Sequence, residues 1–175
     1  MNNLVEIVNT LAGWGTIVSF AAIVLGLYAA ATKKPAVFFA YVHKNALAIS
    51  FALALVSVLG SLFYSIVAGY PPCVLCWWQR VFLFPQVILL GLAVWKKNSR
   101  ILPYAFSLSI VGGAIALYQT YIQYGGSDFF SCDTAPGAIS CTARYVYELG
   151  FVTIPLMSLA AFGLLITVGI ISRRA

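Results

Sequence analysis

The sequence has few charged side chains, and this shortage limits the kind of protein it can be. Of its 175 residues, 10 are Lys or Arg and 4 are Asp or Glu, so charged residues make up 8% of the chain. Soluble domains carry about 25% charged residues. So few charges cannot solvate a globular surface, form a basic stripe for nucleic acid or support a disordered tail. We therefore exclude these classes and expect no nucleic-acid partner.

Hydrophobic residues dominate the chain instead. They make up 62% of it, and the mean hydropathy is +0.98. A membrane-spanning helix needs about 20 mainly apolar residues, and the stretches without charge predict five spans, at residues 10–32, 46–70, 77–95, 102–124 and 150–172. The third is long enough only if it begins near Trp77 and Arg80 reaches toward an interface. The predicted fold class is an all-α integral membrane protein, with a single transmembrane domain over residues 1–175.

The basic residues are distributed unevenly between the two sides of the predicted spans. One side holds Lys33, Lys34, Lys44, Lys96, Lys97, Arg100, Arg173 and Arg174. The other side holds Arg80, Arg144 and all the acids, which are Glu6, Asp128, Asp133 and Glu148. Cytoplasmic loops carry most Lys and Arg, so we expect the N-terminus outside and the C-terminus in the cytoplasm. The connections 71–79 and 125–149 then face the extracytoplasmic side of a cell membrane, and His43, the only histidine, falls in a cytoplasmic loop.

A cleaved signal peptide is the alternative interpretation of the first span, because the small residues 29–31 offer a cleavage site. However, the segment before it contains Glu6 and no Lys or Arg. Cleavage would also leave Lys33, Lys34 and Lys44 outside and invert every later loop. We therefore predict a retained helix.

The four cysteines form two pairs, Cys73 with Cys76 and Cys132 with Cys141, on or next to the predicted outer side. A single free cysteine is common in apolar cores, but four on an oxidising side are not explained as core residues. Three interpretations remain: structural disulfides, a four-thiolate zinc site or a redox relay. The zinc site is disfavoured because the second spacing is too long for a zinc knuckle.

The setting of Cys73 and Cys76 favours the redox relay. Pro71 and Pro72 end the second predicted helix, so the pair stands at the start of the third, where unpaired N–H groups and the helix dipole stabilise a thiolate. Arg80 lies four residues after Cys76 and shares its helix face. An Arg within a span is costly enough to indicate function rather than a topology anchor. We expect it to stabilise the Cys76 thiolate or a carbonyl oxygen of a bound acceptor.

The segment 72–80, PCVLCWWQR, resembles the C-x-L-C-x-x-Q-R motif of the disulfide bond formation protein B family (DsbB), particularly its short BdbC-like branch. The resemblance extends to the second cysteine pair and to segment 148–155, and it covers about residues 46–172. Members are four-helix membrane bundles that reoxidise an extracytoplasmic thioredoxin-fold thiol oxidase (DsbA-like) and pass the electrons to a quinone. It therefore implies a disulfide-generating thiol:quinone oxidoreductase, with one additional N-terminal transmembrane helix.

The resemblance also implies roles for individual residues. It assigns catalysis to Cys73, Cys76, Cys132 and Cys141, and quinone contact to Cys76, Arg80 and Gln79. The pair in the loop 125–149 exchanges with the partner, and the quinone is ubiquinone or menaquinone from the membrane pool. Many members have a His where this chain has Gln119, whose amide can donate a hydrogen bond but cannot transfer a proton near neutral pH.

Two other functions compete with this one. A quinone reductase of the vitamin K epoxide reductase type also has two cysteine pairs, but it places the loop pair before the C-x-x-C, the reverse of the order here. A non-enzymatic membrane protein with structural disulfides would need other polar sites within the membrane. Apart from Arg80, no ionisable group lies within a predicted span.

The charges beside the loop pair predict a direction of disulfide exchange. Asp133 adjoins Cys132 and should raise its pKa, whereas Arg144 follows Cys141 by three residues and should lower the pKa of that thiol. The thiol with the lower pKa is the better leaving group. We therefore expect the partner to attack Cys132 and displace Cys141, which next attacks Cys73.

Overall fold

The computed structural model describes residues 2–32, 36–129, 132 and 139–174, and over these residues the protein is helical. The elements are α1 (Asn2–Thr32), α2 (Ala36–Leu62), the π-helix η1 (Phe63–Val67), α3 (Val74–Trp95), the 3-10 helix η2 (Ser99–Ile101), α4 (Leu102–Gln123) and α5 (Ile154–Arg174). Within the described ranges, five helices are long and apolar enough to cross a membrane. This confirms the predicted all-α, multi-pass membrane protein.

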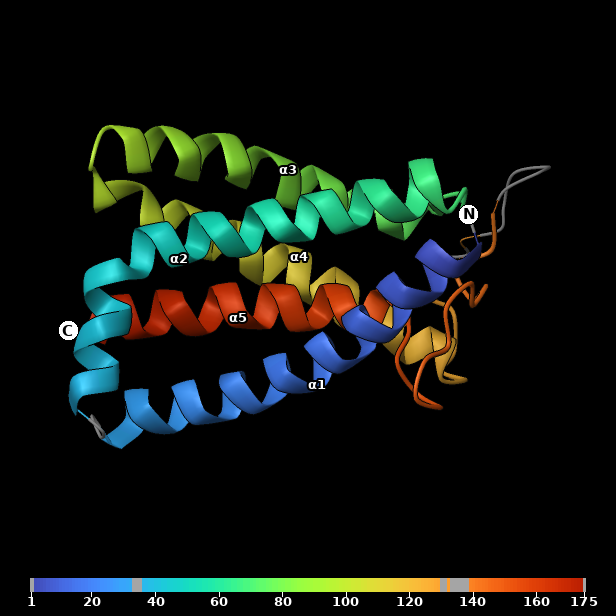
Figure 1. Ribbon diagram of the computed structural model, residues 1–175, viewed down its shortest axis with the longest axis horizontal. Helices are drawn as coiled ribbons and strands as arrows, with labels where there is room; N and C mark the ends of the chain where they lie inside the picture. Colours follow the sequence, from blue (N-terminus) through green and yellow to red (C-terminus); the bar gives the residue numbers. More distant parts are fainter. Residues whose placement is uncertain (1, 33–35, 130–131, 133–138, 175) are drawn as a thin grey trace.

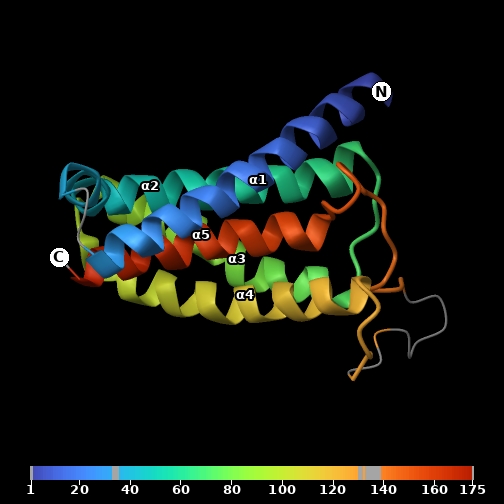
Figure 2. The same ribbon diagram turned by 90° about the horizontal axis from the view of Figure 1, so that it is seen from below.

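Helix α5 lies at the centre of the bundle, where it contacts α1, α2 and α4, while α3 packs between α2 and α4 (Figures 1 and 2). Small residues allow this close packing. A Cβ on Gly112 of α4 would collide with the ring of Phe162 on α5, and one on Gly26 of α1 would collide with Thr167. Helix α1 packs along α5, and its N-terminal part diverges from the other helices (Figure 2).

The two ends of the bundle carry different connections. The N-terminus lies at the same end as the described part of the connection between α4 and α5, whereas the C-terminus lies at the opposite end with the connection between α3 and α4 (Figure 1). This is the alternation that an odd number of spans requires. The cysteine pairs belong to the end that also holds the N-terminus.

The first connection differs from the prediction. Helix α2 begins at Ala36 rather than near residue 46, so His43 and Lys44 lie in a helix and not in a loop. Residues 36–59 contain no Gly or Pro that would interrupt a helix. A charged side chain such as Lys44 marks where a helix leaves the lipid, but it does not end the helix. The first part of α2 runs across the bundle end that holds the C-terminus (Figure 1). Lys33 and Lys34 lie outside the described residues.

The other boundaries shift by a few residues. Helix α1 starts at Asn2 rather than near residue 10, and α2 gives way to η1, which ends at Val67. Helix α5 starts at Ile154 instead of residue 150 because Leu149 and Gly150 adopt φ values of +53° and +77°. The Pro that follows Ile154 suits the first turn of a helix.

Candidate active site

Helix α3 begins early enough to place both cysteines of the first pair at its N-terminus. Cys73 is the N-cap residue, with an extended backbone, and its carbonyl accepts a hydrogen bond from the Trp77 N–H at 3.1 Å. The predicted start near Trp77 was thus three residues late. Cys76 lies in the first turn, where N–H groups without helical partners favour an anionic sulfur. We call Cys73 and Cys76 the inner pair; both are free thiols, with their sulfurs 3.2 Å apart.

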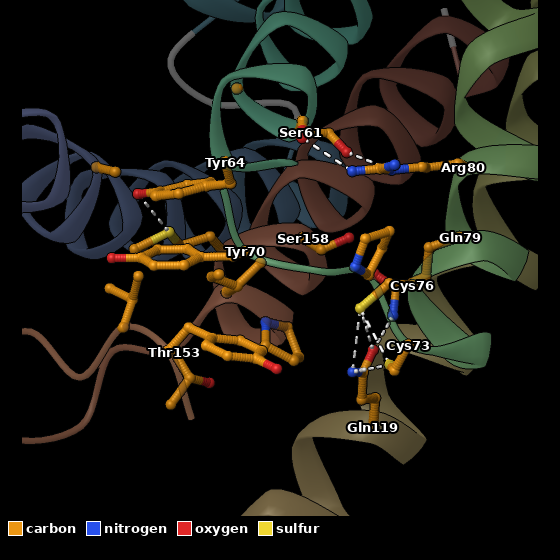
Figure 3. A pocket seen from close by; sticks show the side chains of 18 of the residues that line it. Ser61, Tyr64, Tyr70, Cys73, Cys76, Gln79, Arg80, Gln119, Thr153 and Ser158 are labelled. Atoms are coloured by element: carbon orange, nitrogen blue, oxygen red, sulfur yellow. Dashed lines mark hydrogen bonds between the residues drawn. The ribbon is translucent and has the colours of Figure 1, made fainter. Parts of the chain in front are cut away.

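Gln119 contacts the inner pair directly, and Gln79 contacts Gln119 (Figure 3). Gln119 of α4 has its Nε2 atom 3.1 Å from Cys73 Sγ and 3.4 Å from Cys76 Sγ. Gln79 of α3 donates from Nε2 to Gln119 Oε1 at 2.7 Å. Both side chains are buried. The sequence did not establish a role for Gln119; its signal was that many members of the family the sequence resembles have a His at this position.

Arg80 points from α3 toward α2 (Figure 3). Its guanidinium donates to Ser61 Oγ and to the Ser61 carbonyl oxygen, both at 2.9 Å, and it lies 5.2 Å from the centre of the Trp77 ring. Ser61 stands just before the π-helix η1, and such a local widening often occurs at functional sites. Sequence reasoning missed Ser61, because nothing in the chain indicates which helix faces Arg80.

A cavity of about 280 Å³ opens beside these groups. Cys76, Gln79, Arg80 and Gln119 contribute polar atoms to it. The remaining walls are mainly apolar side chains from α2, α5 and the connection 124–153 between α4 and α5, which we call the outer loop. Helix α1 contributes Ala12. Pockets for small ligands begin at about 300 Å³ and combine apolar walls with a few polar groups. The cavity lies close to this lower limit of volume, and its composition suits a small, mainly apolar ligand with a few polar atoms.

Three tyrosines stack against one another along this cavity, and Figure 3 labels two of them, Tyr64 and Tyr70. The ring centres of Tyr64 and Tyr70 lie 6.1 Å apart, and those of Tyr70 and Tyr145 lie 5.2 Å apart. The Tyr64 hydroxyl contacts Met157 Sδ of α5 at 3.7 Å. The stack joins η1, the connection before α3 and the outer loop, so the cavity has an aromatic wall.

The second pair, which we call the outer pair, is bonded as a disulfide between Cys132 and Cys141, with a Cα–Cα distance of 6.0 Å. Both residues are buried, in one apolar cluster with Cys73 and Ile122, and Cys76 packs against this cluster. The structure thus brings together the two pairs that the sequence separates. Their proximity is the geometry that disulfide exchange between them requires.

Side chains fix the outer pair to the end of α4. The Asp128 carboxylate accepts hydrogen bonds from the Cys132 N–H at 3.1 Å and from the Tyr118 hydroxyl at 2.8 Å. Gln123 donates to the Ala143 carbonyl at 3.0 Å. Sequence reasoning assigned no role to Asp128.

Arg144 anchors the same loop, because it donates to the Gln123 carbonyl and lies over the rings of Tyr124 and Tyr147. A cation here complements the C-terminal end of α4. The expected influence of Arg144 on Cys141 stays a prediction. Asp133, the other charge in that argument, lies outside the described residues.

The surroundings of Cys73 change the pKa of its thiol. The hydrogen bond with the Cys76 side chain, followed by burial, raises the pKa of the Cys73 thiol above its usual range. A thiol with a raised pKa stays protonated. We therefore expect any negative charge of the reduced inner pair to lie on Cys76.

Comparison with known proteins identifies the family of the chain. The model of the family "Disulfide bond formation protein DsbB" matches residues 43–172. The probable disulfide formation protein C of Bacillus cereus is 39% identical over 120 residues, which cover 69% of this chain and 86% of that protein. The disulfide bond formation protein C of Bacillus subtilis is 33% identical over 117 residues, covering 67% and 84%. No solved structure matches the chain.

The fold and the paired cysteines define a multi-pass membrane protein of disulfide-bond formation. The chain belongs to the DsbB family. This confirms the resemblance found in the sequence and agrees with the order of the cysteine pairs, so the vitamin K epoxide reductase type is set aside. The whole of α1 precedes the matched residues, as expected for an additional helix.

Proposed function

We propose that the protein is a thiol:quinone oxidoreductase that reoxidises an extracytoplasmic thioredoxin-fold thiol oxidase. The observation that carries this proposal is the position of the inner pair. Cys73 shares an apolar cluster with the disulfide-bonded outer pair, while Cys76 lines the cavity. One pair can thus pass electrons between a protein partner and a small ligand.

The outer pair receives the electrons. A partner thiolate attacks Cys132, the bond to Cys141 breaks, and Cys141 leaves as a thiolate. Cys141 attacks Cys73 in the oxidised inner pair and displaces the Cys76 thiolate. The second partner thiol then releases the partner as a disulfide, and the freed Cys132 attacks Cys141 to re-form the outer bridge. The net result is one partner disulfide made and the inner bridge reduced to two thiols.

The residues around the cavity fit a quinone. The walls are mainly apolar, Arg80 presents a cation within the membrane, and Cys76 presents a sulfur. A bound quinone, ubiquinone or menaquinone, would supply the acceptor for two electrons. Arg80 and Gln79 would hold its polar ring, and Cys76 would face it as a thiolate. Closure of the bond between Cys73 and Cys76 releases two electrons and two protons, which returns the inner pair to its oxidised form.

The distribution of charge supports a location in the cell membrane with both cysteine pairs on the extracytoplasmic side. Lys96, Lys97 and Arg100 follow α3, and Arg173 and Arg174 end α5, at the bundle end remote from the cysteines. Cytoplasmic ends carry this excess of positive charge. We further propose that residues 1–175 act as a single transmembrane domain.

The activity can be tested with purified protein in detergent. A reduced thioredoxin-fold thiol oxidase is mixed with the protein and a short-chain quinone, and the loss of quinone absorbance is followed. The protein should catalyse this loss, and the matched variant Cys73→Ala/Cys76→Ala should not. If the wild-type protein gives no more loss than the double variant, the proposed activity is wrong.

Trapping tests the direction of exchange. The variants are mixed with the oxidised, disulfide-bonded partner. The lone Cys132 thiolate of Cys141→Ala should attack the partner disulfide and accumulate as a mixed disulfide, because Cys141 is no longer present to displace the partner, whereas Cys132→Ala should accumulate none. Peptide mapping that finds the partner on Cys141 in otherwise wild-type protein would overturn the order of attack while leaving the relay intact.

A further inference from the structure

Two buried amides form a chain that ends at the sulfurs of the inner pair (Figure 3). Gln79 is 7% exposed and Gln119 is 2% exposed, so their polar groups must be satisfied within the protein. Gln79 Nε2 donates to Gln119 Oε1 at 2.7 Å. Gln119 Oε1 also lies 3.8 Å from Cys76 Sγ, but Gln119 Nε2 is the nearer atom to both sulfurs.

Gln119 donates to both sulfurs of the inner pair, at 3.1 Å to Cys73 and 3.4 Å to Cys76. A donor stabilises an anionic sulfur more than a neutral thiol. Two hydrogen bonds in series also strengthen each other in a medium of low dielectric. The guanidinium of Arg80 instead donates to Ser61. Apart from the Cys73 thiol, which lies 3.2 Å from Cys76 Sγ, the side-chain donor in contact with the sulfurs is therefore the Gln119 amide.

We propose that Gln119 is the neutral donor that stabilises the thiolate of the inner pair, and that Gln79 is a positioning residue that keeps this donor turned toward the sulfurs. This proposal deepens the proposed function. It rests on that function only in taking the thiolate to be the sulfur that faces the quinone. Because an amide does not titrate, Gln119 holds the anionic sulfur without exchanging a proton.

The test measures alkylation of Cys76 in reduced protein. Every variant also carries Cys132→Ala and Cys141→Ala, so that only the two cysteines of the inner pair can be alkylated. Met replaces Gln at nearly the same length but without an amide. Gln119→Met should slow alkylation at pH 7 by about ten-fold, the value of one hydrogen bond to a charged group. Gln79→Met should slow it less, because the freed Gln119 amide can still turn its donor toward the sulfur.

Gln86→Met is the matched control. Gln86 is a fully buried glutamine of α3 that donates to the Phe82 carbonyl at 2.9 Å and accepts from Ser109 Oγ of α4 at 3.1 Å. It belongs to the same helix pair and makes no hydrogen bond to either sulfur. Alkylation at the wild-type rate in Gln119→Met, or equal slowing in Gln86→Met, would overturn the proposal.

Gln119→His supplies a second readout, which loss of packing alone would not produce. Imidazole restores a donor and adds an ionisation near its ordinary pKa of about 6.5, so the alkylation rate should recover and gain a new pH-dependent step. The other titratable or charged groups lining the cavity, Arg80, Tyr64, Tyr70, Tyr145 and Arg144, are unchanged in this variant. Absence of both recovery and the new step would contradict a donor role. The assay uses neither quinone nor partner, so its failure is distinguishable from failure of the proposed function.

A separate observation concerns α1. Ala12 lines the cavity, and the adjacent Gly13 lies against the turn that leads into α5. A Cβ on Gly13 would lie 3.3 Å from Glu148 Cβ and 3.6 Å from Leu149 Cδ1. Helix α1 therefore meets both the cavity and this turn, although it precedes the residues matched by the family.

The polar groups around Cys76 suit the ring of a quinone, and the apolar remainder of the cavity suits its hydrocarbon chain. We propose that α1, through Ala12, contacts the apolar chain of the quinone and not its ring. This proposal rests on the proposed function.

Ala12→Phe should raise KM for a long-chain quinone by about ten-fold, as expected when a packed space is overfilled, and should raise KM for a short-chain analogue far less. Ala22→Phe on the exposed side of α1 is the matched control and should change neither. An equal effect on both quinones would assign Ala12 to the ring, and no effect on either would remove α1 from the cavity wall; both results overturn the proposal. If wild-type protein reduces neither quinone, the proposed function itself fails.

Discussion

The inner and outer cysteine pairs are held in place by different kinds of structure. The inner pair stands at the first turn of α3, with an amide from α4 against its sulfurs. The outer pair lies between α4 and α5, where the described residues form turns and an isolated bridge between Glu148 and Val152 instead of a helix. The pair proposed to face a small ligand is therefore positioned by helix packing. The pair proposed to face a protein is positioned by side chains at the end of one helix.

The largest expected effect is a loss of quinone reduction that leaves disulfide exchange at the outer pair intact. Cys76→Ser removes the thiolate of the inner pair, and quinone reduction should fall by roughly 10³-fold or more, as for loss of a nucleophile. The outer pair should still form a mixed disulfide with a reduced thioredoxin-fold partner, which gel electrophoresis without reductant detects. If Cys76→Ser also abolished the mixed disulfide, the two pairs would not be independent.

Arg80→Leu should affect the quinone site at the inner pair and not the outer pair. Loss of a charge-assisted hydrogen bond is worth about 1.5 to 3 kcal/mol, so KM for quinone should rise about 10- to 100-fold. Ser61→Ala keeps the charge and removes one contact of the guanidinium, and its effect should be much smaller. Unchanged quinone kinetics in Arg80→Leu would make this residue a topology anchor.

The inner pair should also show unequal thiols. The pKa of Cys73 is raised, chiefly by the hydrogen bond with Cys76 and then by burial. Only the thiolate reacts with iodoacetamide, so Cys73 should stay unlabelled at a pH where an ordinary cysteine, with a pKa of about 8.5, has reacted. Cys76→Ala removes the largest cause and should move the labelling midpoint of Cys73 to lower pH. A Cys73 midpoint at or below the ordinary value in the reduced wild-type protein would contradict this assignment.

The smallest expected effect belongs to the outer pair. Arg144→Met removes the hydrogen bond to the Gln123 carbonyl and the contacts with Tyr124 and Tyr147. These are worth about 1 kcal/mol, so exchange with the partner should slow about five-fold in stopped-flow measurements. KM for quinone should change less than in Arg80→Leu. The reverse order would mean that the loop also shapes the ligand site.

The sequence predicts the features that depend on neighbours along the chain. The spans follow from runs of apolar residues, and the C-x-x-C at a helix start follows from Pro71 and Pro72. Contacts between helices do not follow, because they depend on how each helix is rotated about its axis. Gln119 beside the sulfurs and Ser61 beside Arg80 are of this kind. The wrong start of α2 has another cause: a charge such as Lys44 marks where lipid ends, not where a helix ends.

The polar pairs between α3 and α4 also bear on how the bundle assembles. Gln79 with Gln119, and Gln86 with Ser109, join the two helices at two levels. Sliding one helix past the other by a single turn, about 5.4 Å, would break both pairs in lipid, where each is worth about 0.6 to 2 kcal/mol. Both helices emerge from the ribosome before residues 124–153. The register that brings Gln119 to the inner pair can therefore be set in a helical hairpin before the outer pair has been synthesised.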